Sequence, residues 1–283
     1  MLTAHSSQLT AHSSQLTAHS SQLTAHSSQL TAHSSQLTAI NCHQKELYES
    51  YEANSIQYYM NSYEAVLSKY KSNKQINILD IGGASGNFAL AVKNYFGASA
   101  SVYVIDTTSY DTWEQETYSR NITFIKDSIE NLKSCFPDEM RFDLIFANRV
   151  FHHFVSSSWE KTLDGMNDYL SMIHDRLSPE GSFCIHDHFY NGYVCDAASS
   201  YVIYKITSCR IPFVASIAKR FGARSAGVGV CFQSERMWLK RLRENGFANI
   251  TLNRTVYKHL RGIKRIILMN REYSLDNMII CRK

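Results

Sequence analysis

The sequence lacks long apolar runs, paired cysteines and a dense cluster of one charge. No uncharged stretch approaches the roughly 18 residues that a membrane-spanning helix needs, and no basic segment followed by an apolar one marks a secretion signal. The seven cysteines are scattered and never spaced Cys-x-x-Cys, which argues against a disulfide framework or a zinc site. The formal net charge of +4 is small for a dedicated nucleic-acid binder. We therefore expect a soluble, cytoplasmic protein that holds no metal ion.

The beginning of the chain repeats one short polar unit. The heptad Leu-Thr-Ala-His-Ser-Ser-Gln starts at evenly spaced leucines, which are Leu2, Leu9, Leu16, Leu23 and Leu30. A period of seven suggests a coiled coil, but each copy offers a single leucine, with histidine three positions later and no charge pairs. Serine and threonine also favour local hydrogen bonds that compete with a helix. We predict that residues 1–38 form a disordered tail with no catalytic role.

The rest of the chain is organised around one strand–turn–helix segment. Ile76–Ile81 is a nearly unbroken apolar run, as in a strand that is buried on both faces of a parallel sheet. Gly82, Gly83 and Gly86 follow, and they allow positive φ and a close approach of the backbone to a ligand. Apolar residues then recur at helical spacing over residues 87–96. This order predicts the first βα unit of a nucleotide-binding sheet.

The next predicted strand ends in an acid. Residues 100–105 are apolar and β-branched, and Asp106 follows them twenty positions after Gly86. An acid at that offset can accept hydrogen bonds from both hydroxyls of an adenosine ribose. Alternatively, the glycine turn only tightens a corner and Asp106 caps the next segment. The turn reads Gly-Gly-Ala-Ser-Gly and lacks the Gly-x-Gly-x-x-Gly that seats a dinucleotide pyrophosphate.

With Asp80 two residues before the first glycine, this turn resembles the first motif of class I S-adenosylmethionine-dependent methyltransferases of the small-molecule type. The resemblance covers residues 74–190 and resumes weakly toward the C-terminus. It implies S-adenosyl-L-methionine as cofactor, bound by residues at the strand ends, which are Asp80, Gly82, Gly83, Ala84, Gly86, Asp106, Thr107, Asp127, Ser128 and Asn148. In that family an acid after the third strand accepts from the adenine amino group, a role for Asp127 here. A plain helix N-cap is the competing interpretation of Asp127.

The pattern predicts an α/β fold with a doubly wound, mostly parallel, seven-stranded Rossmann-like sheet. Beyond the first two strands, strands are predicted at residues 121–125, 142–147, 182–185, 249–257 and 275–281. The expected segments are a tail at 1–38, N-terminal helices at 39–73, a cofactor-binding core at 74–189, a helical cap insertion at 190–233, and a C-terminal helix with an antiparallel strand pair at 234–283.

Candidate catalytic residues follow the fourth and fifth strands, and they are His152, His153, His186 and His188. A base that removes a proton from a hydroxyl acceptor raises the rate by about 10² to 10⁴, and the unperturbed pKa of histidine suits this role. Asp187 is well placed to orient one of them. The loop Val-Phe-His152-His153-Phe resembles the catalytic loop of plant-type small-molecule O-methyltransferases, which have Asp where this chain has His153. Packing or structural hydrogen bonding is the alternative for each histidine.

The resemblance implies methyl transfer to a small or medium, partly hydrophobic acceptor, most readily at oxygen. Two alternatives stay open. One is a protein or RNA methyltransferase, for which the basic segment 258–271 is the hint; the other is a non-catalytic module that only binds S-adenosylmethionine. Asn148 is followed by Arg149-Val150 rather than by Pro-Pro-aromatic, which argues against DNA as a partner. The expected partner is a small-molecule acceptor.

Overall fold

The computed structural model describes residues 55–283 except 74, 210 and 212–226, and the backbone alone of residue 264. The chain divides into two compact units, Met1–Gln57 and Tyr58–Lys283. Everything described below belongs to the second unit, apart from the first residues of one helix. The predicted repeat tail and the first of the predicted N-terminal helices lie outside the described residues.

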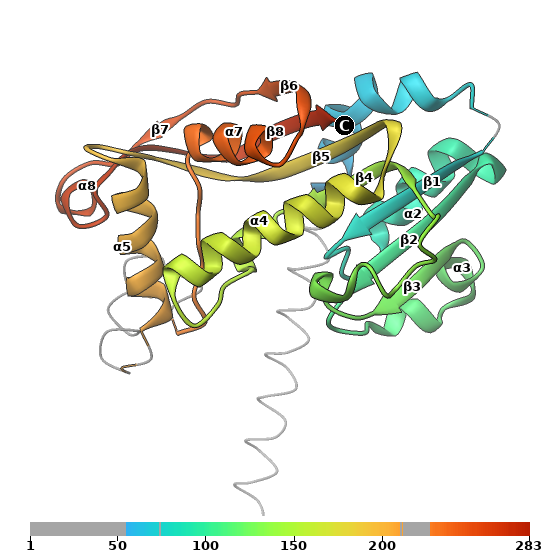
Figure 1. Cartoon of the computed structure of the whole chain (residues 1–283), viewed down its shortest axis with the longest axis horizontal. Coiled ribbons are helices and arrows are strands. Elements are labelled where there is room, and N and C mark those ends of the chain that lie inside the picture. The colour runs from blue at the N-terminus through green and yellow to red at the C-terminus, as the bar shows by residue number, and fades with distance from the viewer. Residues whose placement is uncertain (1–54, 74, 210, 212–226) are drawn as a thin grey trace, which may run out of the picture. The chain divides into compact units, whose positions relative to one another are not determined.

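A single sheet forms the centre of the second unit (Figure 1). Its strands follow the order β3-β2-β1-β4-β5-β8-β6, and β7 pairs with β8. The strands are β1 (Ile76–Ile81), β2 (Ala100–Asp106), β3 (Ile122–Lys126), β4 (Phe142–Asn148), β5 (Leu177–Gly192), β6 (Ala248–Asn253), β7 (Lys258–His259) and β8 (Asn270–Arg282). Strands β1 to β5 pair in parallel, whereas β8 runs antiparallel between β5 and β6. The predicted doubly wound, mostly parallel sheet is confirmed, with the short β7 as an addition.

Helices connect the strands. They are a helix at residues 55–70, α2 (Asn87–Phe96), α3 (Glu116–Ser119), α4 (Trp159–Arg176), α5 (Asp196–Ser208), α7 (Glu235–Glu244) and α8 (Ile263–Ile267), with short 3₁₀ turns η1 (Gly97–Ser99), η2 (Asp111–Glu114), η3 (Ile129–Asn131) and η4 (Phe151–His153). Within the described chain, no helix is both long enough and apolar enough to cross a bilayer.

The helices cover both faces of the sheet, as the apolar strands require. Leu170 of α4 joins a buried cluster with Ile145 of β4, and side chains of α7 belong to the same cluster. On the other face, Tyr63 and Phe88 pack on Phe146, with ring centroids 5.0 and 5.1 Å away. Ile145 and Phe146 are consecutive, so their side chains point to opposite faces. The two layers of helices therefore enclose β1 and β4, whose carboxyl ends flank the topological switch point.

Local sequence signals set the ends of the helices. Ser158 and Ser234 accept hydrogen bonds from the N–H groups of Lys161 and Met237, and so cap α4 and α7. Gly246 follows α7 with φ 86°, the left-handed conformation in which glycine commonly ends a helix. These boundaries follow from short-range chemistry.

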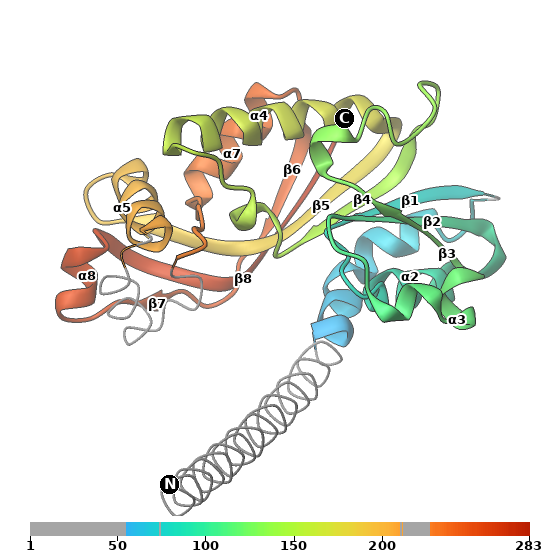
Figure 2. The same ribbon diagram turned by 90° about the horizontal axis from the view of Figure 1, so that it is seen from below.

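Two strands are longer than predicted. β5 was expected at residues 182–185 and β8 at 275–281, yet they pair with each other from Ser182–Arg282 to Gly192–Asn270. Once the two strands lie side by side, each further residue gains backbone hydrogen bonds, which outweighs its weak strand propensity. The extension carries β7 and α8 to the end of the sheet away from β3 (Figures 1 and 2). Because 190–192 belong to β5 and 212–226 are outside the described residues, the helical cap at 190–233 stays a prediction.

Candidate active site

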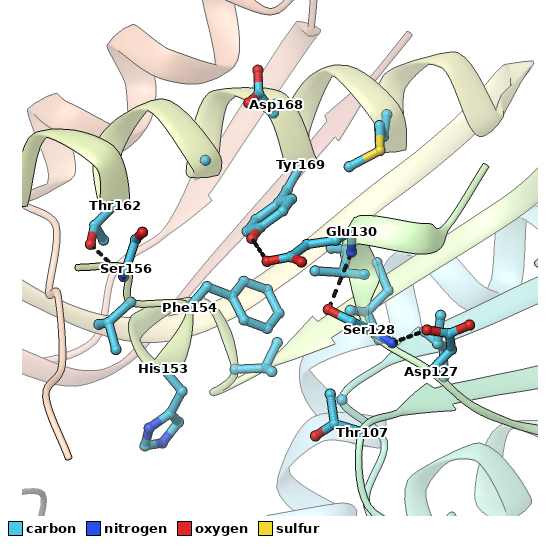
Figure 3. Close-up of a pocket in the computed structure, with 18 of the residues that line it drawn as sticks. Thr107, Asp127, Ser128, Glu130, His153, Phe154, Ser156, Thr162, Asp168 and Tyr169 are labelled. Carbon is cyan, nitrogen blue, oxygen red and sulfur yellow. Dashed lines mark hydrogen bonds between the residues drawn. The ribbon is translucent and has the colours of Figure 1, made fainter. Parts of the chain in front are cut away.

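A cavity of about 800 Å³ opens at the carboxyl ends of β1, β2 and β3, beside α4 (Figure 3). Its wall brings together two groups of residues. The strand ends contribute Gly82, Asp106, Thr107, Asp127 and Ser128, and the segment after β4 contributes Val150, His153, Phe154, Val155 and Ser156. Tyr169 of α4 donates a hydrogen bond to Glu130, at 2.9 Å, and so connects the helix to the turn after β3. The cavity volume lies in the range of small-molecule and cofactor sites.

The glycine corner after β1 has no room for side chains. Gly82 has φ 68°, and a Cβ added there would lie 2.4 Å from Cγ2 of Val150. A Cβ on Gly83 would lie 2.6 Å from a carboxylate oxygen of Asp80, and one on Gly86 would lie 2.7 Å from the ring of Phe124. Each contact is shorter than a Cβ tolerates, so glycine is required for packing as well as for φ. The backbone of Gly82 forms part of the cavity wall for this reason.

Asp106 braces this corner. One of its carboxylate oxygens accepts from the N–H of Ala84 at 3.1 Å, and the other accepts from the N–H of Thr108 at 2.9 Å. A carboxylate has about four lone-pair sites, so both oxygens can accept further hydrogen bonds. Asp106 is half-buried on the cavity wall, and a ribose could supply such donors.

The segment before β3 also holds the corner, through contacts that the sequence pattern did not predict. Trp113 donates from Nε1 to the carbonyl of Ala84 at 2.9 Å, and Thr112 donates to the carbonyl of Ser85 at 2.6 Å. The indole of Trp113 stacks on Phe124, with ring centroids 4.6 Å apart. The available signal was a tryptophan within an otherwise polar stretch, because a large aromatic side chain there needs a surface to cover.

Asp127 takes part in its own turn. Its Oδ1 accepts from the N–H of Ser128 and from the side chain of Asn131, both at 2.7 Å, and these bonds lower its pKa. Ser128 is the N-cap of η3, since its hydroxyl accepts from the N–H of Glu130. Asp127 and Ser128 both line the cavity. The turn-forming role is therefore present, and the adenine role stays a prediction.

Asp80, Asn148 and His186 lie on the sheet face that residues 58–70 of the first helix (55–70) cover. Tyr63 donates to Oδ1 of Asn148 at 2.8 Å, and His186 packs against Tyr59 with centroids 4.8 Å apart. All three side chains keep buried polar atoms without a hydrogen-bond partner among the described residues, namely Oδ2 of Asp80, Nδ2 of Asn148 and both ring nitrogens of His186. Unpaired buried polar atoms are costly, and their concentration near the strand ends suggests a ligand.

The carboxyl of Asp80 makes the stability of the chain depend on pH. Burial, together with the charge of Asp106, raises its pKa from 3.8 to about 8. The folded chain thus keeps a proton that the unfolded chain releases near pH 3.8. The free energy of unfolding therefore falls as pH rises from 3.8 to about 8, by at most about 1.4 kcal/mol per pH unit. We expect Asp80→Asn to remove this component.

Urea unfolding of both chains across this pH range tests the expectation. The stability difference between Asp80→Asn and the native chain should grow with pH. The fully exposed Asp138 offers a matched control, since Asp138→Asn should leave the native pH profile unchanged. Parallel pH profiles for Asp80→Asn and the native chain would contradict the protonated carboxyl.

A buried histidine–aspartate pair lies behind the cavity. Nδ1 of His152 lies 2.6 Å from Oδ1 of Asp187, whose carboxylate also accepts from the backbone N–H groups of His152 and His188, at 3.2 and 2.7 Å. Burial alone would raise the pKa of Asp187, but the charge and hydrogen bond of His152 outweigh it and hold the pKa below its ordinary value. Of the predicted histidines, the structure therefore pairs His152 with Asp187.

The other histidines differ in their surroundings. His153 is exposed on the cavity wall, its ring centroid 4.1 Å from that of His152, and partial desolvation and the charge of His152 lower its pKa to about 4. His188 lies 5.2 Å from His152, and its Nδ1 is 2.6 Å from the carbonyl of Leu275. His186 is fully buried on the opposite face, and burial lowers its pKa to about 3. The structure groups His152, His153 and His188 and separates His186 from them.

The site fits S-adenosylmethionine. The cavity offers the carboxylate of Asp106 to a ribose and the bare backbone of Gly82 to a close contact. Asp80 and Asn148 do not line this cavity and lie on the other face of the sheet, where Asp80 keeps an unused acceptor and Asn148 an unused donor. These atoms complement the ammonium and carboxylate groups of an amino acid.

Comparisons with known proteins give one family match. Residues 52–252 match the family model described as "Methyltransferase domain". A search of curated proteins gave no match.

Among solved structures, the YcgJ protein of Bacillus subtilis is similar at 16% identity and a TM-score of 0.49, covering 79% of this chain and 98% of that one. The arsenic(III) S-adenosylmethionine methyltransferase of Chlamydomonas reinhardtii is similar at 17% identity and a TM-score of 0.48, covering 73% of this chain and 62% of that one. Human N-acetylserotonin methyltransferase is similar at 13% identity and a TM-score of 0.46, covering 81% of this chain and 54% of that one. The chain thus spans less than two thirds of the length of the latter two proteins.

The match of the family model extends over more than half of the chain, from the helix before β1 to β6. The chain therefore belongs to the methyltransferase domain family.

Proposed function

We propose that the acceptor is a small or medium, partly hydrophobic molecule that is methylated at oxygen. The observation that carries this proposal is the composition of the cavity. One wall combines Asp106 and Thr107 with the segment from His153 to Ser156, so a single space holds polar groups for a nucleoside and a mixed apolar surface with a histidine. Phe154 and Val155 supply the apolar part, which suits an acceptor with a hydrophobic body.

Donor binding is proposed for the residues around the corner. Asp106 would accept from the ribose hydroxyls, and Asp127 with Ser128 would lie at the adenine end of the cavity. Asp80 and Asn148 would meet the amino-acid end, where their unpaired atoms gain partners. When bound, S-adenosylmethionine supplies the methyl carbon as the electrophile.

The histidines are proposed to handle the acceptor proton. His153 borders the cavity with a lowered pKa, so its ring is neutral at physiological pH and can take the proton as the acceptor oxygen attacks. His152 lies directly behind it, and Asp187 fixes the orientation of the His152 ring. Asp187 stabilises positive charge that develops on the two imidazoles, since it is a buried carboxylate with a lowered pKa.

A panel of acceptors tests the proposal. The full chain is incubated with methyl-labelled S-adenosylmethionine and small phenols, aliphatic alcohols, amines and thiols, and also with RNA and a protein mixture. Label on a phenol or alcohol, located at oxygen by mass spectrometry, is the expected result. Label only on RNA or protein would overturn the small-molecule proposal, and label on nitrogen would overturn the oxygen assignment.

The pH dependence of turnover follows from His153. A base must be unprotonated in the free enzyme, so kcat/KM should rise as pH passes about 4 and stay level from there through neutrality. His153→Ala should lower kcat by about 10² to 10⁴. The exposed His259 is a matched control, and His259→Ala should keep normal turnover. Normal turnover of His153→Ala, with an inflection near pH 6.5 in the native chain, would contradict His153 as the base.

A further inference from the structure

The end of the sheet farthest from β3 presents an unusual surface. There the extensions of β5 and β8 carry β7 and α8, next to α5 (Figures 1 and 2). We define the α8 surface by its exposed residues, which are Tyr193, Val194, Val256, Lys258, Arg261, Ile263, Arg265, Ile266 and Ile267. It lies outside the wall of the active-site cavity.

Large aliphatic side chains on this surface lie in solvent. Ile263, Ile266 and Ile267 occur at i, i+3 and i+4 on α8, so they share one face of the helix, and they are 64%, 76% and 47% exposed. Val194 and Val256 are 78% and 83% exposed. Single exposed apolar residues are common, but three isoleucines on one face of a helix form an apolar group of the kind that interaction sites expose.

The same surface carries an excess of positive charge. Residues 254–271 contain six lysines and arginines and no aspartate or glutamate. Arg254 and Arg271 pair with Glu235 and Glu272. Lys258, Arg261 and Arg265 are exposed, and none of these three forms an ion pair with a described residue.

We infer that the α8 surface docks on membranes that contain anionic phospholipids. Branched aliphatic side chains partition into the boundary between headgroups and acyl chains, and a rim of lysine and arginine binds anionic headgroups. Both features occur on and beside α8, at the tip of the extended β5 and β8. The inference is independent of the acceptor proposed above.

Two other partners fit less well. RNA is bound by aromatic stacking platforms in addition to charge, whereas the exposed apolar residues here are mainly aliphatic, and the ring of Tyr193 is already covered by Arg265 at 4.5 Å. A second copy of this chain meeting the same surface would bring Lys258, Arg261 and Arg265 against their own counterparts, which like-charge repulsion opposes.

Vesicle flotation of the full chain tests the inference. The chain should float with vesicles of phosphatidylcholine mixed with phosphatidylglycerol, and not with phosphatidylcholine alone. Raising the salt concentration should release it, because screening weakens the attraction to anionic headgroups. Ile263→Asp with Ile266→Asp, and separately Lys258→Glu with Arg261→Glu, should each lower the partition coefficient roughly tenfold or more.

A matched pair of surface cations controls for net charge. Lys69 and Arg243 are exposed and lie on the helix at residues 55–70 and on α7. Lys69→Glu with Arg243→Glu should change vesicle binding far less. Thermal melting with and without S-adenosylmethionine confirms that each variant is folded, and the Lys258/Arg261 pair provides the test if the isoleucine pair is unstable. The inference would be overturned if the native chain did not float with anionic vesicles, or if the control pair lost as much vesicle binding as the Lys258/Arg261 pair. Binding of this surface to RNA or to a second copy, without binding to vesicles, would also overturn it.

Discussion

Asp106→Ala is expected to weaken S-adenosylmethionine binding by roughly two orders of magnitude, from the loss of hydrogen bonds to a charged acceptor worth about 1.5–3 kcal/mol each. The carboxylate is half-buried on the cavity wall and has lone pairs left for two ribose hydroxyls. It also accepts from the N–H groups of Ala84 and Thr108, so its removal loosens the glycine corner as well. Isothermal titration calorimetry measures the affinity.

Two further variants separate these effects. Asp106→Asn keeps one acceptor oxygen and should lose less affinity than Asp106→Ala. Asp138→Ala removes a fully exposed carboxylate elsewhere and should bind S-adenosylmethionine like the native chain. An affinity of Asp106→Ala equal to that of the native chain would refute the ribose assignment, whatever the acceptor proves to be.

Asp187→Ala should be among the most destabilising substitutions in the chain, with a loss of about 3–5 kcal/mol in the free energy of unfolding. It leaves three N–H donors without an acceptor, those of the His152 backbone, the His152 ring and the His188 backbone. Asp187 and His152 are both buried, so water cannot easily replace the carboxylate. Urea unfolding measures the loss.

Asp187→Asn separates stability from catalysis. It keeps the volume and one acceptor oxygen, so its stability loss should be smaller, yet turnover should fall because the negative charge near His152 is gone. Asp143 is the matched control. It also accepts two hydrogen bonds, from the Asn77 N–H and the Ser178 hydroxyl, but lies at the opposite end of β4. Asp143→Asn should cost stability and keep normal turnover; equal turnover in the two asparagine variants would argue against a catalytic role for Asp187.

Short-range patterns account for the features that the sequence predicted correctly. The apolar run of Ile76–Ile81 and the glycines after it specify a strand and a turn by themselves. An apolar run favours a strand buried on both faces, and glycine allows positive φ. The serine caps and the glycine after α7 are local in the same sense. The doubly wound, mostly parallel sheet follows because parallel strands joined by helices have few ways to pack.

Contacts between distant segments could not be predicted. Val150 lies over Gly82, and Trp113 holds the carbonyl of Ala84, although each pair is separated by many residues. The lengths of β5 and β8 depend on their mutual pairing, which neither strand encodes alone.

The positions of the histidines follow from local sequence, whereas their contacts depend on distant segments. The sequence by itself determined that histidines and Asp187 would follow the strands at the carboxyl edge of the sheet, because strand ends can be located from hydrophobic pattern. Only the tertiary structure decided which of them meet. Consecutive residues of a strand point to opposite faces, so Asp187 reaches His152 on the α4 side while His186 is buried against Tyr59 on the other. Packing of helices on the two faces therefore pairs His152 with Asp187 and leaves His186 packed against Tyr59.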